Sequence, residues 1–120
     1  MTEKDFWRFL EKAWEKGMAA QVCGSMDSPD PEIQAAGAYI GGHALLPADY
    51  QDISEEVIQS IGMLLLRPGV GFRTKEAIMV LLAHQASKTA LNVLKEYNRA
   101  PDEDLRYFAK FALDECKCWN

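Results

Sequence analysis

The segment that decides the fold is SKTALNVLKEYNRAPDEDLRYFAKFALDEC, residues 87–116. On both sides of Pro101-Asp102, its apolar residues recur three or four positions apart, which is the period of an amphipathic helix. Ser87 is a favourable N-cap for the first helix. The segment therefore predicts two helices joined by a short turn. Their apolar positions are Ala90, Leu91, Val93, Leu94 and Tyr97 in the first helix and Leu105, Phe108, Ala109, Ala112, Leu113 and Cys116 in the second.

The sequence before this segment predicts further helices, because the alternation typical of strands is weak. A first helix with an aromatic face ends near Gly17, and a shorter helix follows over residues 18–26. Asp30 is expected to cap the next helix, with Pro31 in the first turn, where its missing N–H costs nothing. The expected inner face of that helix consists of Ile33, Ala36, Gly37, Ile40 and Ala44, and residues 46–51 are expected to form a loop.

Two more helices are expected between this loop and Ser87. Asp52 and Glu55 have the spacing of a capping box, which would open the first of them. Thr74 is expected to cap the second, whose inner face holds Ala77, Ile78, Leu81 and Leu82. The whole pattern predicts an all-α fold in a single domain over residues 1–120.

Small residues recur at corresponding places in three of these helices. Gly37, Ala77 and Ala109 are separated by 40 and 32 residues. Each small residue lies in the second helix of a proposed outer helix–turn–inner helix unit, and such pairs bury their apolar faces only by stacking. We therefore expect about three stacked pairs, with the N-terminal aromatic helix covering the open end of the first pair.

The 87–116 segment resembles a HEAT-like repeat in its Asp-containing turn, in Leu105-Arg106 and in Ala109 with Ala112-Leu113. The resemblance extends more weakly over residues 18–44 and 54–84, where Gln34 and Thr74 depart from the family pattern. It implies an α-α superhelix of about three helical pairs with an N-terminal capping helix. Most members of this family are protein-binding scaffolds, so the resemblance also implies a binding role.

Amino-acid composition limits the classes of protein to which this chain can belong. The 120 residues are 48% hydrophobic and 26% charged, with a net charge of −5, which is typical of one soluble globular domain. The apolar runs are too short to span a bilayer, and no signal peptide is expected at the N-terminus. Three cysteines, an odd number, favour a reducing cytoplasm over a disulfide framework. No membrane association is therefore expected.

Charge is distributed unevenly along the chain. Residues 17–66 contain seven acidic residues and no Lys or Arg, whereas residues 67–99 are net basic. Such asymmetry can steer a charged partner, although an unevenly solvated surface is the other interpretation. The acidic total disfavours nucleic acid, because a duplex-binding domain normally carries a basic excess. A basic protein or peptide is the expected partner.

A candidate binding surface follows from the repeat alignment. Tyr39, Met79 and Phe111 each lie two residues after a matched small residue, with Tyr107 beside Phe111. The row is either packing between repeats or a groove for a partner, with a polar rim of Glu32, Gln34, Arg106 and Lys110. The preferred function is noncatalytic protein binding through this inner-helix face, and an immunity- or antitoxin-type inhibitor is one specific form. A homodimer joined through Trp7, Trp119 and Tyr107 is a further alternative.

The alternative from another class is a small metal- or redox-dependent enzyme. His84 and Cys116 each lie seven residues after a matched small residue, so adjacent helices would bring them together, with Cys118 as a third ligand. A buried His and Cys filling the core is the simpler interpretation of the same spacing. His43 and His84 match no recognised catalytic motif, so no cofactor is expected and the protein is expected not to be an enzyme.

Overall fold

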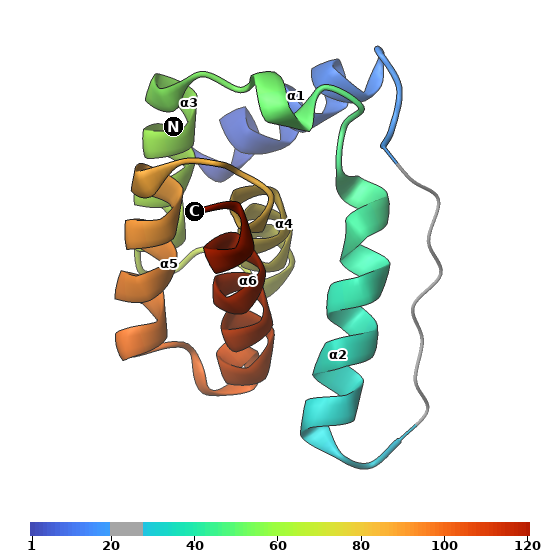
Figure 1. Ribbon diagram of the computed structural model, residues 1–120, viewed down its shortest axis with the longest axis vertical. Coiled ribbons are helices and arrows are strands. Elements are labelled where there is room, and N and C mark those ends of the chain that lie inside the picture. Colours follow the sequence, from blue (N-terminus) through green and yellow to red (C-terminus); the bar gives the residue numbers. More distant parts are fainter. Residues whose placement is uncertain (20–27) are drawn as a thin grey trace.

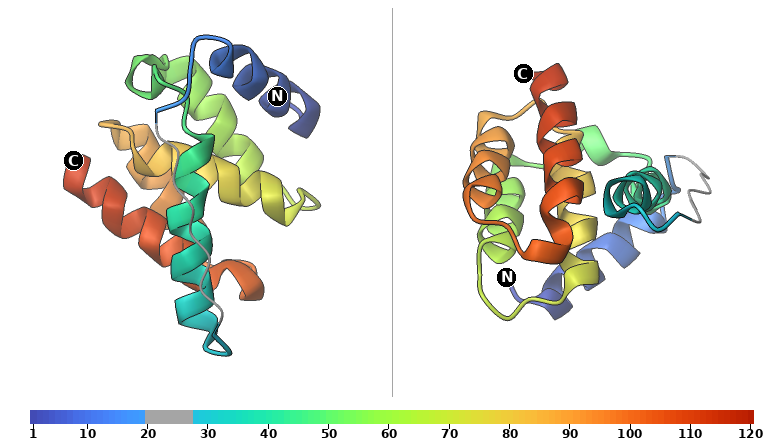
Figure 2. Two further views of the ribbon diagram at one scale, coloured as in Figure 1. Left: turned by 90° about the vertical axis from the view of Figure 1, so that its right-hand side faces the viewer. Right: turned by 90° about the horizontal axis from the view of Figure 1, so that it is seen from below.

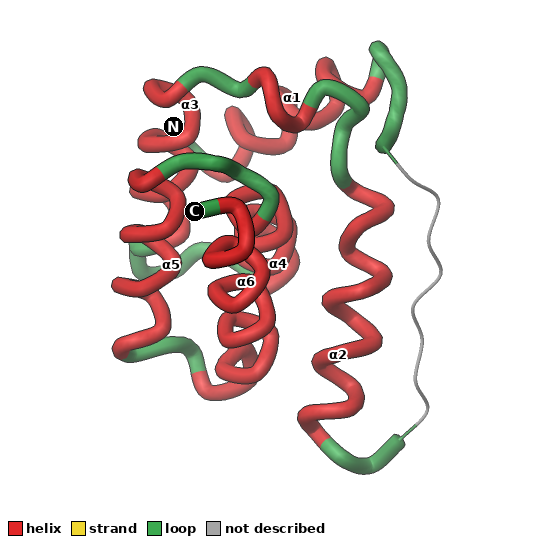
Figure 3. The backbone as a smooth tube through the Cα atoms, in the orientation of Figure 1, coloured by secondary structure: helices red, strands yellow, loops and turns green. Residues whose placement is uncertain are grey.

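A computed structural model describes residues 1–19 and 28–120, and its regular elements there are helices, apart from one β-bridge between Met18 and Pro47. The α-helices are α1 Glu3–Trp14, α2 Pro31–Gly42, α3 Glu55–Leu65, α4 Phe72–Ala83, α5 Lys88–Arg99 and α6 Arg106–Trp119 (Figure 1). Three short 3₁₀ helices connect them: η1 His43–Leu45, η2 Tyr50–Asp52 and η3 Glu103–Leu105 (Figure 3). The all-α prediction is confirmed. In the described part of the chain, every helix is too short or too polar to cross a bilayer.

The helices other than α1 form three layers, which are α3 with α5, α4 with α6, and α2 alone (Figure 2). Hairpins α3–α4 and α5–α6 lie side by side, so that α3 contacts α5 and α4 contacts α6 (Figure 2, right). Helix α2 forms the third layer and packs against both α4 and α6, with the larger contact to α6. A strictly sequential stack would place α2 mainly on α4, since each repeat then touches only its neighbours. The main neighbour of α2 is therefore not the helix pair that follows it in the sequence.

The buried face of α2 differs from the expected one. Ile33 and Ile40 are 42% and 43% exposed, whereas Gly37 and Tyr39 are buried. Only the small Gly37 of the predicted stripe is fully covered, and the large side chain that α2 buries is Tyr39. The covered face is the one turned toward α6, where the Tyr39 ring packs edge to face on Phe108 with centroids 5.2 Å apart.

Helix α1 covers the α3–α4 hairpin. Phe6 and Leu10 are buried there, and the indole N–H of Trp7 donates to Thr74 Oγ1 at 3.0 Å. At the other end of α1, the indole N–H of Trp14 donates to the Leu45 carbonyl at 2.8 Å. The N-terminal helix thus covers this hairpin rather than the predicted pair over residues 18–44. The helix expected over residues 18–26 lies outside the described residues, except for Met18 and Ala19, which are not helical.

Some predicted caps are confirmed and others are corrected. The side chains of Asp30 and Ser87 accept hydrogen bonds from backbone N–H groups in the first turns of α2 and α5, as expected. Helix α3 begins instead after Ser54, whose hydroxyl accepts from the Val57 N–H, so Asp52 is not its cap. Helix α4 begins after Gly71, and Thr74 is buried inside it. Thr74 is not a cap because its hydroxyl is already engaged with α1.

The core is centred on α4, which is covered on all sides from Ala77 to Ala83. The three matched small residues, Gly37, Ala77 and Ala109, are all buried in the layers formed by α2, α4 and α6. Between the outer helices, a Cβ added to Gly62 would lie 2.6 Å from Val93 Cγ2. Helices α3 and α5 therefore approach closely at the one point where α3 has no side chain.

Candidate functional site

The predicted Tyr39–Met79–Phe111 row is mostly core. Met79 has no exposed surface and Tyr39 is only 8% exposed, while Phe111 is half-buried. The Tyr39 and Phe111 rings do lie together, with centroids 6.1 Å apart. The expected row had Met79 between the two rings, whereas Tyr39 meets Phe111 directly because α2 packs mainly on α6, and Met79 is not accessible to a partner. The interpretation of the row as packing between helices is the one that the structure favours.

The predicted rim residues lie at the surface, near a groove between α2 and the start of α6. Glu32, Arg106 and Lys110 are exposed, and Tyr107 is half-buried. The groove has a volume of about 440 Å³. It is lined by Pro31, Gln34, Ala35 and Ala38 of α2, by Glu76 of α4, and by residues Glu103 to Phe108. Of the predicted binding and rim residues, Gln34, Arg106 and Tyr107 line it directly.

The groove is predominantly acidic. The carboxylates of Glu76, Glu103 and Asp104 line it together with one cation, Arg106. Arg106 forms an ion pair with Glu103, and its guanidinium lies 4.8 Å from the centre of the Tyr107 ring. Burial raises the pKa of Glu76, an effect that Arg73 opposes. A half-buried carboxylate of this kind would be stabilised by a cationic group of a ligand.

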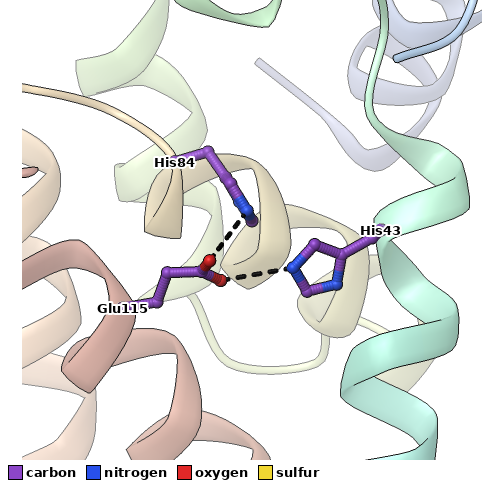
Figure 4. A group of neighbouring side chains, drawn as sticks. All are labelled: His43, His84 and Glu115. Atoms are coloured by element: carbon purple, nitrogen blue, oxygen red, sulfur yellow. Dashed lines mark ion pairs between the residues drawn. The ribbon is translucent and has the colours of Figure 1, made fainter. Parts of the chain in front are cut away.

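A second group of polar side chains lies at the opposite end of α2. His43 follows the last residue of α2, His84 follows the last residue of α4, and Glu115 lies in α6. His43 Nε2 is 3.3 Å from Glu115 Oε1, and His84 Nε2 is 3.1 Å from Glu115 Oε2 (Figure 4). One side chain from each of the three helices α2, α4 and α6 therefore converges on a single point.

Contacts with backbone carbonyls determine which nitrogen of each histidine ring faces Glu115. His84 Nδ1 lies 2.7 Å from the Val80 carbonyl, and His43 Nδ1 lies 2.9 Å from the Tyr39 carbonyl. A carbonyl oxygen only accepts hydrogen bonds, so Nδ1 carries the proton in both rings. In a neutral imidazole, the Nε2 lone pair is then directed toward the Glu115 carboxylate.

The Tyr39 hydroxyl and the ring of Tyr50 surround this cluster. The hydroxyl of Tyr39 donates to Glu115 Oε1. Burial, together with this carboxylate, raises the pKa of Tyr39 above its ordinary value. The His43 and His84 rings lie edge to face, with centroids 4.7 Å apart, and Tyr50 flanks His84. His84 is buried, whereas 24% of the His43 side chain and 31% of the Glu115 side chain are exposed.

The cysteines predicted as partners of His84 do not join it. Cys116 is buried with its Sγ 3.8 Å from the Gln85 carbonyl, and burial raises the pKa of its thiol to about 11. Cys118 is exposed, with its Sγ 3.5 Å from the Asp114 carbonyl. Within the described residues, the cluster of potential ligands that contains His84 consists of His43, His84 and Glu115. The alternative ligand set His84, Cys116 and Cys118 is therefore wrong, and burial of His84 and Cys116 agrees with the simpler interpretation of the same spacing.

The repeat alignment contained a signal for the two other members of this cluster, His43 and Glu115. His43 lies six residues after Gly37 and Glu115 six residues after Ala109, whereas His84 lies seven residues after Ala77. In the alignment that pairs His84 with Cys116, His43 and Glu115 each lie one position before the residue equivalent to His84. That shift was not predictable, because small rotations between packed helices decide which of two successive side chains points to a neighbour.

Comparisons with known proteins identified no relative of this chain. No family model matches the chain, and neither the search of curated proteins nor that of solved structures found a match.

Proposed function

We propose that this protein is a noncatalytic protein-interaction module whose acidic groove binds a basic segment of a partner. The observation that carries the proposal is the groove between α2 and α6, where the carboxylates of Glu76, Glu103 and Asp104 surround a space of about 440 Å³. Complementary charge across an interface favours association and restricts orientation. A Lys or Arg side chain entering this groove would meet carboxylates and an aromatic ring.

The groove has two features of a protein-binding site. Tyr107 offers a half-buried ring of the kind that frequently dominates binding energy at interfaces. The half-buried Glu76 carboxylate reaches the groove from α4, so three separate segments of the chain contribute to its walls. Exposed Glu32 on α2 extends the acidic surface beyond the groove.

The HEAT-like architecture belongs to the same proposal. The hairpins α3–α4 and α5–α6 pack as adjacent units, α3 on α5 and α4 on α6, which supports two stacked repeats. Helix α2 would be the inner helix of the first unit, moved onto α6. The proposal places the protein in the cytoplasm, which the free thiols of Cys116 and Cys118 support.

A pair of synthetic peptides tests the proposed function. The first is a 12-residue fluorescent peptide rich in Lys and Arg, and the second has the same apolar residues with Glu in place of the basic ones. We expect the basic peptide to bind, with an affinity that falls as salt rises. Glu76→Gln should weaken it about fivefold, corresponding to roughly 1 kcal/mol, and Tyr107→Ala by at least as much.

The matched control is Glu11→Gln, which makes the same charge change at an exposed position of α1. It should leave the affinity unchanged. Equal binding of the two peptides, or equal effects of Glu76→Gln and Glu11→Gln, would contradict the proposal.

A further inference from the structure

The cluster of His43, His84 and Glu115 has a ligand set that the proposed function does not use. Its donor atoms come from three helices and all lie within 4.8 Å of one another. We propose that these three side chains bind one divalent transition-metal cation, with Zn²⁺ as the best-suited ion. Imidazole nitrogens and a carboxylate oxygen are ligands that zinc commonly takes in proteins. The inference does not depend on the acidic groove.

The distances between donor atoms fit a metal site. Zinc–nitrogen and zinc–oxygen bonds of about 2.0–2.2 Å in a tetrahedral site separate neighbouring donor atoms by roughly 3.3 Å. The two distances from histidine Nε2 atoms to Glu115 oxygens are 3.3 and 3.1 Å. Each Nε2 atom approaches a different oxygen of the same carboxylate, and the donor atoms of the three residues lie within 4.8 Å of one another, so a cation would draw them closer by rotation of the rings and the carboxylate.

The surroundings of the cluster orient these ligands as they do in known metal sites. A metal-binding histidine usually donates its other ring N–H to a carbonyl or carboxylate, which fixes the tautomer and directs the free nitrogen at the ion. Both histidines make this contact, His43 with the Tyr39 carbonyl and His84 with the Val80 carbonyl. The Tyr39 hydroxyl holds the Glu115 carboxylate in the same manner. Each of the three ligands thus has its own supporting contact.

The burial of the cluster suits a bound ion that remains accessible. The His84 side chain is only 7% exposed, and it is flanked by the rings of Tyr50 and Trp119. His43 and Glu115 are partly exposed, so solvent reaches two of the three proposed ligands. Protonated histidines would form ion pairs with Glu115 in the absence of a metal. The experiment must therefore distinguish a metal site from this metal-free ion-pair network.

Metal binding would have a structural consequence. Helix α2 buries only Gly37 and Tyr39 fully, so its attachment to α4 and α6 depends on few large side chains. A cation held by His43, His84 and Glu115 would link α2 to both helices at one end. We therefore expect the metal to raise the thermal stability of the whole chain, since a ligand that binds only the folded state stabilises it.

The experiment is a titration of the chelator-treated 120-residue protein with Zn²⁺ and with Co²⁺. The background variant carries Cys23→Ser and Cys118→Ser, which leaves the buried Cys116 as the remaining thiol. We expect saturation at one ion per chain, a higher melting temperature, and a Co²⁺ spectrum without a thiolate-to-cobalt charge-transfer band. Absence of saturable binding, or a strong charge-transfer band, would overturn the proposal.

Point variants locate the site. Glu115→Gln and His43→Ala remove a ligand and should weaken binding by more than about 100-fold, while Tyr39→Phe removes only a supporting contact and should weaken it roughly tenfold. Asp114→Asn is the matched control, because it neutralises the neighbouring exposed carboxylate on α6, and it should change nothing. Glu115→Gln is nearly isosteric, so it remains informative if circular dichroism shows that His43→Ala does not fold. Equal affinity in the Glu115→Gln and Asp114→Asn variants would refute the site.

Discussion

Lys75 in the first turn of α4 places its Nζ 2.6 Å from Oδ2 of Asp102, in the turn that precedes α6. The Lys75 side chain is 8% exposed, whereas one-third of the Asp102 side chain is exposed. The hydroxyl of Tyr97 in α5 also donates to Asp102 Oδ2, at 2.5 Å. This carboxylate therefore connects α4, α5 and the start of α6, and the hydrogen bond from Lys75 is the main cause of its lowered pKa.

The two halves of this pair are not equivalent. Asp102→Ala leaves the buried ammonium of Lys75 without its counterion and should lower the free energy of unfolding by about 2–3 kcal/mol. Lys75→Met leaves a partly exposed carboxylate that still accepts from Tyr97 and should cost less than about 1 kcal/mol. Urea unfolding at pH 7 measures both values, with the exposed neighbour Glu103→Gln as control. Equal losses in the two variants would show that burial of Lys75 is not the deciding factor.

The contact between α3 and α5 predicts a steric effect at Gly62. Gly62→Ala places its Cβ 2.6 Å from Val93 Cγ2, and a β-branched side chain has little freedom to move away. Overpacking of about 1–3 kcal/mol outweighs the gain of up to 1 kcal/mol in helix propensity, so we expect a net loss of about 1 kcal/mol. Val93→Ala should relieve the clash, so that the double variant is more stable than the sum of the two single effects predicts.

Acid sensitivity is expected from Glu3, which links α1 to the start of α4. Its carboxylate accepts hydrogen bonds from the Thr74 hydroxyl, at 2.6 Å, and from the Gly71 N–H, at 3.0 Å. These bonds, with that from Thr74 the stronger, lower the pKa of Glu3. The folded state then holds its proton less tightly than the unfolded state. The stabilisation is present above the unfolded value of about 4.5 and is lost as the pH falls through the lower folded value.

Denaturation curves at pH 7, 5, 4 and 3 measure this effect. Glu3→Gln should lose part of the decrease in stability between pH 5 and pH 3 that the parent protein shows. Glu11→Gln on the exposed face of α1 is the control and should retain the full decrease. Identical pH profiles for the parent and Glu3→Gln would exclude these hydrogen bonds as a source of acid sensitivity.

The two C-terminal cysteines should differ in reactivity. The thiolate is the reactive form of cysteine, and burial raises the pKa of Cys116 to about 11, so its thiol stays protonated at pH 8. Cys118 is exposed on the same helix. Alkylation followed by peptide mass analysis should modify Cys118 in the native protein and Cys116 only in urea. Comparable native rates would mean that the end of α6 opens readily.

Local features of the structure were predictable from the sequence. Helices α2, α5 and α6 form where the sequence predicts them, and the buried faces of α5 and α6 follow the apolar period. The caps Asp30 and Ser87 use side chains within three residues of the N–H groups that they satisfy. The direct contact of Tyr39 with Phe111 was not among these features, because the spacing of the small residues placed Met79 between the two rings. For Thr74, local spacing was misleading, because its hydroxyl bonds to Glu3 and Trp7, about 70 residues earlier in the chain.

The sequence by itself determined where helices form and which small residues lie between them, since periodicity and capping depend on neighbours within one or two turns. Only the tertiary structure decided that α2 lies on α6, that Met79 is buried, and that His43, His84 and Glu115 converge. The physical reason is that helix–helix packing is the sum of many weak contacts over all pairs of helices. A rotation of one residue position exchanges Cys116 for Glu115 as the neighbour of His84, and no local pattern in the sequence records that rotation.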